Sequence, residues 1–323
     1  MALHRDSRLL TPPSYDGFIT RDDPDDPRMG DLIDRGEYPG ERVRLVIIGC
    51  PQDEGVRRNG GRPGAAGGPG AFRTMLARLT PYNLLTDSSL PVGSVWDAGD
   101  VRCEGTLEEV HARLHEVVAA VCGAGRLPVV IGGGHDITYP VIAGAASVHG
   151  ALGALNVDAH LDVRPPSPHR NSGTSFRMAV DEGLVAGARF VELGVQEFAN
   201  ARAHVHWVRE RGGEVVSLEE VRRVGIDAAV GAALERASAE GTAPLYATLD
   251  MDAVCAAAAP GVSAPMPDGL SAADLLGSAR AIGRHPQVVA FDVAELNPGF
   301  DVDGRTARLA ARAAMAFMAA RLA

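Results

Sequence analysis

The stretch LGALNVDAHLDVR (residues 152–164) places ionisable side chains directly after a run of apolar residues. Asp158, His160 and Asp162 occupy every second position there. In an extended chain, residues two apart face the same side, so these three side chains converge. Because like charges that are desolvated together are strongly disfavoured, a positive charge must lie between them. The stretch therefore predicts a buried strand that ends at a cation-binding site.

Apolar runs of strand length alternate along the chain with amphipathic stretches of helical periodicity, such as residues 107–121, 200–212 and 272–283. The predicted strands are residues 44–49, 94–99, 127–133, 152–158, 188–195, 214–218, 244–250 and 287–295. This alternation is typical of an α/β fold, in which helices cover both faces of a mostly parallel sheet.

Residues 1–42 differ from the rest of the chain because they are polar and rich in Pro, Asp and Arg. We expect them to form an irregular arm that lies on the body of the protein. Residues 43–323 are expected to form a single domain, since α/β enzymes of this length commonly fold as one unit.

Composition excludes several classes of function. The net charge of -10 argues against broad binding to nucleic acids or anionic membranes, which requires basic patches. The first thirty residues lack the apolar segment of a signal peptide, and no apolar run is long enough to span a membrane. The four cysteines are scattered, so neither a disulfide framework nor a thiolate zinc site is expected. We expect a cytoplasmic protein.

Two further strands end in the same way. Asp250 and Asp252 stand two apart in TLDMDAV (248–254), and His135 follows three glycines in GGGHD (132–136). Each pattern alone is weak, because such residues also occur as caps, in turns or at the surface. The carboxyl ends of parallel strands, however, meet at one edge of a sheet, where ligands bind. Together these segments predict one cluster.

A cluster of four aspartates and two histidines predicts a pair of metal ions. Four neighbouring carboxylates resist joint ionisation, whereas two divalent cations would cancel their charge. Oxygen-dominated ligands with two imidazoles and no thiolate favour Mn(II), although the same ligands accept Co, Ni or Fe. Bridging carboxylates would hold the ions about 3.5–4 Å apart, the spacing of two-metal hydrolases.

These segments resemble the four signature segments of the ureohydrolases, the family of arginase, agmatinase and formimidoylglutamase. GGGHD, NVDAHLDVR, TLDMDAV and FDVAELNP (291–298) occur in the family's order over roughly residues 44–300. The resemblance implies the three-layer arginase-like fold, with an eight-stranded, mostly parallel sheet. It also implies two Mn(II) ions per subunit with a bridging hydroxide, and a homo-oligomer.

The resemblance also implies a role for each residue of the cluster. The implied ligands are His135, Asp158, Asp162 and Asp250 for one ion, and Asp158, His160, Asp250 and Asp252 for the other. Asp158 and Asp250 would then bridge the two ions. Glu295, in VAELNP, matches the family carboxylate that orients the cationic C–N group of the substrate. The predicted catalytic residues are Glu295, Asp158 and His160.

The segment HRNSGTSFRMA (169–179) indicates the substrate. Arginases and agmatinases that resemble this chain usually carry a proton-shuttling His immediately before the Gly, where this chain has Ser172. Its SGT pattern resembles that of formimidoylglutamases, whose substrate has an amidinium head and two carboxylates. Carboxylates call for arginine, because its planar guanidinium pairs with them through two hydrogen bonds. The predicted substrate-binding residues are Arg164, Arg62, Ser172 and Arg177.

Three histidines outside the signature segments are considered as possible members of this site. His169 is a candidate to replace the missing proton shuttle, because it precedes the SGT segment on the same loop. His204 and His206 are expected to lie at the surface or to serve in packing.

The leading prediction is therefore hydrolysis of N-formimidoyl-L-glutamate to L-glutamate and formamide, in histidine breakdown. Metal-bound hydroxide would attack the formimidoyl carbon while the ions and Glu295 stabilise the intermediate. One alternative is an agmatinase or another guanidino-acid ureohydrolase, which would release urea. A second is a non-catalytic, metal-binding family member with a regulatory role. The presence of all six ligands and Glu295 argues against the second alternative.

Overall fold

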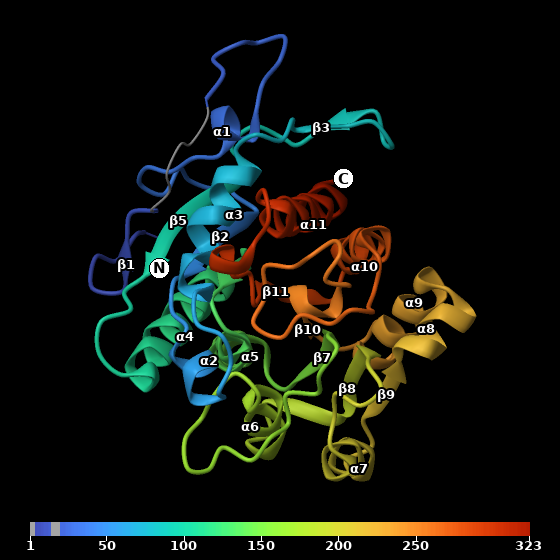
Figure 1. Cartoon of the computed structure of the whole chain (residues 1–323). Helices are drawn as coiled ribbons and strands as arrows, with labels where there is room; N and C mark the ends of the chain where they lie inside the picture. Colours follow the sequence, from blue (N-terminus) through green and yellow to red (C-terminus); the bar gives the residue numbers. More distant parts are fainter. Residues whose placement is uncertain (1–3, 14–19) are drawn as a thin grey trace.

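A sheet of nine strands forms the middle layer of the structure, a computed structural model that describes residues 4–13 and 20–323 (Figure 1). The strand order is β1-β5-β2-β6-β11-β10-β7-β8-β9. Eight of the strands run parallel: β2 (Leu45–Cys50), β5 (Val95–Val101), β6 (Leu127–Gly132), β7 (Leu152–Val157), β8 (Val185–Val195), β9 (Glu214–Ser217), β10 (Leu245–Asp250) and β11 (Val288–Ala294). Each of these strands falls on one of the eight predicted runs, so the predicted sheet is confirmed.

Helices cover both faces of the sheet, as the alternation of the sequence predicts. One face is packed by α1 (Met29–Leu32), α3 (Gly68–Leu76), α8 (Leu218–Val224), α9 (Ile226–Ala237), α10 (Ala272–Arg284) and α11 (Arg305–Leu322). The other face is packed by α4 (Leu107–Gly123), α5 (Thr138–His149), α6 (Ser175–Asp181) and α7 (Arg202–Glu210). Strand β2 shows the principle, because Leu45 and Ile47 enter the first core whereas Val46 and Ile48 enter the second.

The N-terminal segment contributes a ninth strand. Residues Leu10–Thr11 form β1, which pairs antiparallel with Val101 and Asp100 of β5. Arg5 donates from Nε to the carbonyl oxygen of Ala98 at 2.7 Å. The predicted irregular arm thus includes short regular elements that are fastened to the sheet edge, while residues 1–3 and 14–19 lie outside the described residues.

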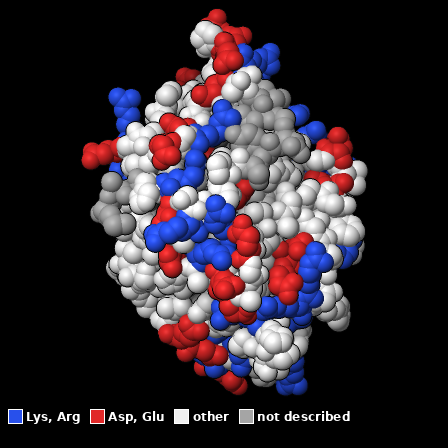
Figure 2. Space-filling model, turned by 90° about the vertical axis from the view of Figure 1, so that its left-hand side faces the viewer, with Lys and Arg blue, Asp and Glu red and all other residues white. Residues whose placement is uncertain are grey.

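Short elements complete the fold. They are α2 (Glu54–Arg58), the hairpin of β3 (Tyr82–Asn83) and β4 (Ser88–Ser89), and the 3-10 turns η1 (Ala65–Gly67), η2 (His135–Ile137), η3 (Met251–Ala253) and η4 (Pro298–Phe300). None of the helices in the described ranges is long and apolar enough to cross a membrane. Basic and acidic side chains lie next to one another over the face shown in Figure 2, so this face carries no extended patch of a single charge.

Candidate metal centre and its pocket

Four neighbouring strands end at the candidate site. β6, β11, β10 and β7 lie side by side in that order, and their carboxyl ends open at one edge of the sheet. The turn η2 follows β6, and η3 follows β10. A Cβ on Gly133 would lie 1.6 Å from the carbonyl oxygen of Gln52, so only glycine lets the chain pass there. The glycines before His135 therefore serve the close approach that the sequence predicts.

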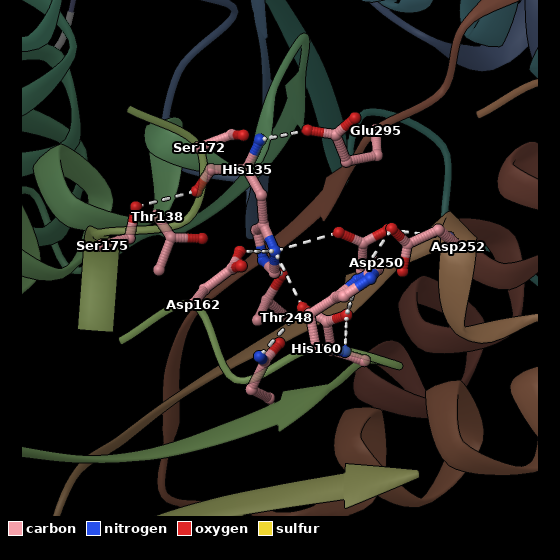
Figure 3. Close-up of polar contacts among 12 residues, drawn as sticks. His135, Thr138, His160, Asp162, Ser172, Ser175, Thr248, Asp250, Asp252 and Glu295 are labelled. Atoms are coloured by element: carbon pink, nitrogen blue, oxygen red, sulfur yellow. Dashed lines mark hydrogen bonds and ion pairs between the residues drawn. The ribbon is translucent and has the colours of Figure 1, made fainter. Parts of the chain in front are cut away.

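His135 lies at the centre of three carboxylates (Figure 3). Its Nδ1 is 3.0 Å from Oδ2 of Asp162, 3.0 Å from Oδ2 of Asp250 and 3.2 Å from Oδ2 of Asp158. None of these contacts has the geometry of a hydrogen bond, and Nδ1 of His135 is buried. One nitrogen and three oxygens thus surround a point at which a cation fits.

His160 forms a second group beside the first. Its Nδ1 is 3.2 Å from Oδ2 of Asp252 and 3.5 Å from Oδ1 of Asp158. Asp158 therefore faces one histidine with each of its two oxygens, which is the arrangement of a bridging ligand. The structure brings together all six residues that the sequence predicts as metal ligands.

A hydrogen-bond chain behind His135 fixes its tautomer. Nε2 of His135 lies 3.1 Å from Oγ1 of Thr248, and that hydroxyl donates to the carboxylate of Asp292. The hydroxyl oxygen therefore accepts from the Nε2–H, and the lone pair of Nδ1 points at the carboxylates. Metal-ligating histidines commonly donate their other ring N–H in this way. The residues present consequently fit a metal ion better than an internal ion pair.

The pKa shifts of the carboxyl groups indicate that the cluster contains too little positive charge. Burial raises the pKa of Asp250 well above its usual range, and Asp252 and Asp158 add to this shift. Burial also raises the pKa of Asp252 to about 7, against the opposing effect of His160. Asp158 differs, because its contacts with His135 and His160 outweigh burial and lower its pKa. Two imidazoles therefore do not suffice for four aspartates, and two divalent cations would supply the missing charge.

Glu295 lines the pocket at this site and has one carboxylate oxygen without a partner in the described residues. It follows β11 directly, and its Oε1 accepts from the backbone N–H of His135 at 3.0 Å. Its Oε2 is buried and has no hydrogen-bond partner within residues 4–13 and 20–323. The φ angles of Glu295 (64°) and Asp162 (46°) lie in the left-handed region, which costs a non-glycine residue about 1–2 kcal/mol. Such strain is commonly found at functional sites.

A pocket of about 410 Å³ opens above the cluster. Its floor includes His135, His160, Asp162, Asp250, Asp252 and Glu295. Its walls include residues 59–62, Arg164, Ser172, residues 199–201, His204 and residues 263–264. The volume suits a small molecule whose reacting group reaches the cluster.

Comparisons with known proteins agree with this geometry. The model of the arginase family matches residues 43–320. The chain belongs to the arginase family.

Several members of this family are similar to the chain. A formimidoylglutamase of Geobacillus thermodenitrificans is 40% identical over 270 residues, which cover 82% of this chain and 81% of that protein. A formimidoylglutamase of Aromatoleum aromaticum is 41% identical over 283 residues, covering 83% and 80%. A crystal structure of Trypanosoma cruzi formiminoglutamase with manganese has a TM-score of 0.84 and 37% identity, and covers 91% of this chain and 98% of that one.

Of the three predicted substrate-binding arginines, only Arg164 both lines the pocket and has guanidinium donors without a partner in the described residues. Arg164 donates from Nη1 to Oδ1 of Asn59 at 2.6 Å and makes no ion pair with an acidic side chain of the described residues. Its backbone N–H donates to the carbonyl oxygen of Gly173 at 2.8 Å. A Cβ on Gly173 would lie 3.0 Å from Cδ of Arg164, so the glycine of the SGT segment leaves room for this side chain.

The other two arginines hold the structure together. Arg62 lines the pocket, but its guanidinium donates to the carbonyl oxygens of Ser263 (3.0 Å) and Val262 (2.6 Å) and packs on the ring of Phe300. Arg177 is not among the pocket residues of the described chain. It donates to the carbonyl oxygen of Val163 at 3.3 Å, lies 3.6 Å from Asp181 and packs over Trp207.

Ser172 and the histidines considered for the site differ in their position relative to the pocket. Ser172 lines the pocket and accepts a hydrogen bond from Nδ2 of Asn59 at 3.0 Å. His169 is exposed and does not line the pocket, so the structure does not bring this candidate shuttle to the cluster. His204 is half-exposed, which agrees with its expected place at the surface, but it also lines the pocket, which the sequence pattern does not indicate. The signal that could have found it is its place in the segment that follows β8, a parallel strand whose carboxyl end lies at the same sheet edge.

Other buried groups support the ligands from behind. Nδ2 of Asn156 donates to Asp158 at 3.1 Å and to Glu192 at 2.8 Å. Asp136, next to His135, accepts from Nε2 of Gln52 at 2.6 Å and lies 2.7 Å from Nε2 of His111. Such contacts hold the first ring of ligands in one orientation.

Proposed function

We propose that this chain is a metal-dependent hydrolase that converts N-formimidoyl-L-glutamate and water into L-glutamate and formamide. One observation carries the proposal. The six-residue cluster lies on the floor of a small-molecule pocket, in a chain about 40% identical to proteins named formimidoylglutamase. Ser172, in place of the expected shuttle histidine, supports this substrate over a guanidino compound.

Two Mn(II) ions are the proposed cofactor. His135, Asp158, Asp162 and Asp250 would hold one ion, and Asp158, His160, Asp250 and Asp252 the other. When bound, such a pair lowers the pKa of water and polarises the bond to be cleaved. The backbone N–H groups of His160 and Asp252 each donate at 2.7 Å to an aspartate two residues earlier, which fixes the directions of Asp158 and Asp250.

Glu295 orients the amidinium head of the substrate in this proposal. Its Oε1 is held by the N–H of His135, which leaves the buried Oε2 free to accept from a substrate N–H. A charge-assisted hydrogen bond of this kind is about twice as strong as a neutral one. Glu295 would thereby place the formimidoyl carbon over the cluster.

Arg164 binds a carboxylate of the substrate tail in this proposal. Its Nε and Nη2 donors have no partner in the described residues, and the side chain lines the pocket. A guanidinium with two free donors fits the bidentate pairing that carboxylates favour. Ser172 lies on the same wall and would contact the tail as well.

We place this activity in the cytoplasm, in a homo-oligomer. All four cysteines are free, which suits a reducing compartment. Leu84 and Leu85 are 80% and 78% exposed on the β3–β4 hairpin, and such exposed apolar side chains suit a contact between subunits.

A substrate panel tests the proposed function. The Mn-loaded protein would be supplied with N-formimidoyl-L-glutamate, arginine, agmatine and guanidinobutyrate, and urea and formamide would be measured separately. We expect formamide from the first compound and no urea from the others. Urea release at an enzymatic rate would instead indicate a guanidino-acid ureohydrolase. Bound metal without turnover of any compound would indicate a regulatory protein.

A further inference from the structure

Arg164 and His204 face the pocket from different elements, and neither has an acidic partner among the described residues. Arg164 belongs to the loop after β7, and His204 lies in the first turn of α7. His204 makes no side-chain hydrogen bond within the described part of the chain. A pocket whose floor is acidic thus has a wall that offers donors to an anion.

The wall that carries His204 is fastened to the metal cluster. Asn200 accepts from the N–H of Leu161 at 3.0 Å and donates from Nδ2 to the carbonyl oxygen of Ala159 at 2.9 Å. The N–H of Gln196 donates to the same oxygen at 3.1 Å. These bonds join the start of α7 to the loop that holds two of the proposed ligands. The segment that leads into the helix carrying His204 is therefore anchored to the loop of the reacting centre.

The start of α7 also favours an anion. The helix begins after Ala201, whose side chain offers no cap, and residues 199–201 line the pocket. The free N–H groups of a first turn carry a partial positive charge. This effect adds to that of the histidine on the same turn.

The charge of the substrate requires a second group that can bind a carboxylate. N-formimidoyl-L-glutamate carries two carboxylates, and a buried charge without a partner is costly. Arg62 and Arg177 are occupied by carbonyl oxygens, Asp181 and aromatic rings, as described above. Arg164 can pair with one carboxylate, so His204 is the group left for the other.

The shape of the substrate assigns the two positions. Its α-carboxylate is one carbon from the scissile nitrogen and must stay near the metal cluster. Arg164 follows the proposed ligand Asp162 by two residues and lines the pocket above the cluster. The side-chain carboxylate stands two methylene groups farther out and can reach another wall.

We propose that His204 is a specificity-determining residue that binds the side-chain carboxylate of the substrate, while Arg164 binds the α-carboxylate. This inference rests on the proposed function for the identity of the ligand. The charges around His204 affect its protonation. Burial lowers the pKa of His204, and the charges of Arg164 and Arg177 lower it further. A carboxylate bound beside His204 would oppose this shift and favour the protonated imidazole.

Kinetics on a substrate pair test the assignment. We expect His204→Ala to raise KM for N-formimidoyl-L-glutamate about tenfold and to leave kcat within about threefold, because a binding contact is lost in ground and transition state alike. KM for N-formimidoyl-L-glutamine, which lacks the side-chain carboxylate, should not respond. His204→Arg should restore the low KM, and His206→Ala, on the same helix but outside the pocket, is the matched control. An unchanged KM in His204→Ala, or equal changes on both substrates, would overturn the assignment.

Calorimetry with glutarate separates this inference from the proposed function. Glutarate has two carboxylates and no scissile bond, so its binding to the Mn-loaded protein does not depend on turnover. We expect His204→Ala to weaken this binding about tenfold and His206→Ala to leave it unchanged. If the protein binds glutarate through His204 but releases no formamide, the proposed function fails and the subsite stands. If formamide is released but His204→Ala leaves glutarate binding unchanged, the assignment of His204 is wrong and the proposed function is supported.

Discussion

Two buried clusters of charge in this molecule are built on opposite principles. Arg73 of α3 is 2% exposed and bonds Asp97 at 2.8 Å and Asp100 at 2.5 Å, both on β5. This cluster contains its own cation, and the two aspartates outweigh the effect of burial and raise the pKa of Arg73. In the pocket, by contrast, the aspartates lack a sufficient cation and Arg164 lacks a carboxylate. The Arg73 cluster, whose charges are matched within it, stabilises the fold. The cluster in the pocket, whose charges are unmatched, is suited to bind ligands.

The largest expected effect comes from removing a bridging carboxylate of the unmatched cluster. Asp158 faces both histidines, so Asp158→Ala should lose both ions and essentially all activity. Elemental analysis and formamide release would measure this. Asp250→Ala should behave alike, and Asp268→Ala, which removes an exposed aspartate, should change neither quantity. Two tightly held ions in Asp158→Ala would contradict the ligand assignment.

The matched cluster should respond in stability instead. Arg73→Met removes the guanidinium that neutralises two buried carboxylates, so we expect the free energy of unfolding to fall by about 3–5 kcal/mol. Arg222→Met, which removes an exposed ion pair with Asp268, should cost less than about 1 kcal/mol. Denaturant unfolding would compare the two variants. Similar losses in both would show that the burial of the Arg73 cluster carries no special weight.

Acidity should weaken the hold on the metal. Metal-free Asp252 has a pKa raised to about 7 by burial, so below that pH a proton must leave before a metal binds. We expect the affinity for Mn(II) to fall about tenfold for each pH unit below 7 for each proton displaced. Calorimetric titration between pH 8 and pH 5.5 would measure it. An affinity that is flat over this range would mean that Asp252 is not a ligand.

The sequence predicts the unmatched cluster better than its ligand-binding walls, for a physical reason. Six metal-ligand candidates follow from strand ends and two-residue spacing, which are local properties. The role of Arg62 depends on carbonyl oxygens of Val262 and Ser263, which lie 200 residues along the chain. No periodicity in the sequence reports such loop contacts. The same limit hid β1, whose partner strand lies about 90 residues away.

Arg164 tests the other half of the unmatched pocket. Arg164→Ala should raise KM for N-formimidoyl-L-glutamate at least about tenfold, or roughly 1.4 kcal/mol, because a carboxylate loses its partner. Metal content should not change, since guanidinium is no metal ligand. Arg170→Ala, on the same loop but outside the pocket, is the control. Formamidine, which has no tail, should be hydrolysed equally by parent and variant. Equal losses on both substrates would show that Arg164 supports the metal centre instead.

The smallest expected effect is on the stability of the metal-free protein. Replacing an aspartate by asparagine should raise this stability in the unmatched cluster and lower it in the matched cluster. Asp252 keeps its proton to about pH 7 in the folded state, whereas an unfolded aspartate releases it near pH 4. The metal-free protein therefore loses stability from this group as pH rises from about 4 to 7, and the loss is complete above 7. Asp252→Asn removes this destabilisation. At pH 8 we therefore expect the free energy of unfolding of the metal-free variant to be about 1 kcal/mol higher than that of the parent.

The equivalent change in the matched cluster should destabilise the protein. Asp97→Asn removes a charge that Arg73 needs, so the free energy of unfolding should fall at the same pH. Denaturant unfolding in the presence of a chelator would measure both variants. Added Mn(II) should reverse the order for Asp252, because the parent gains the binding free energy of its full ligand set and the variant loses part of it. If Asp252→Asn destabilises the metal-free protein as Asp97→Asn does, the cluster at the strand ends is balanced without metal, and the contrast between the two clusters is wrong.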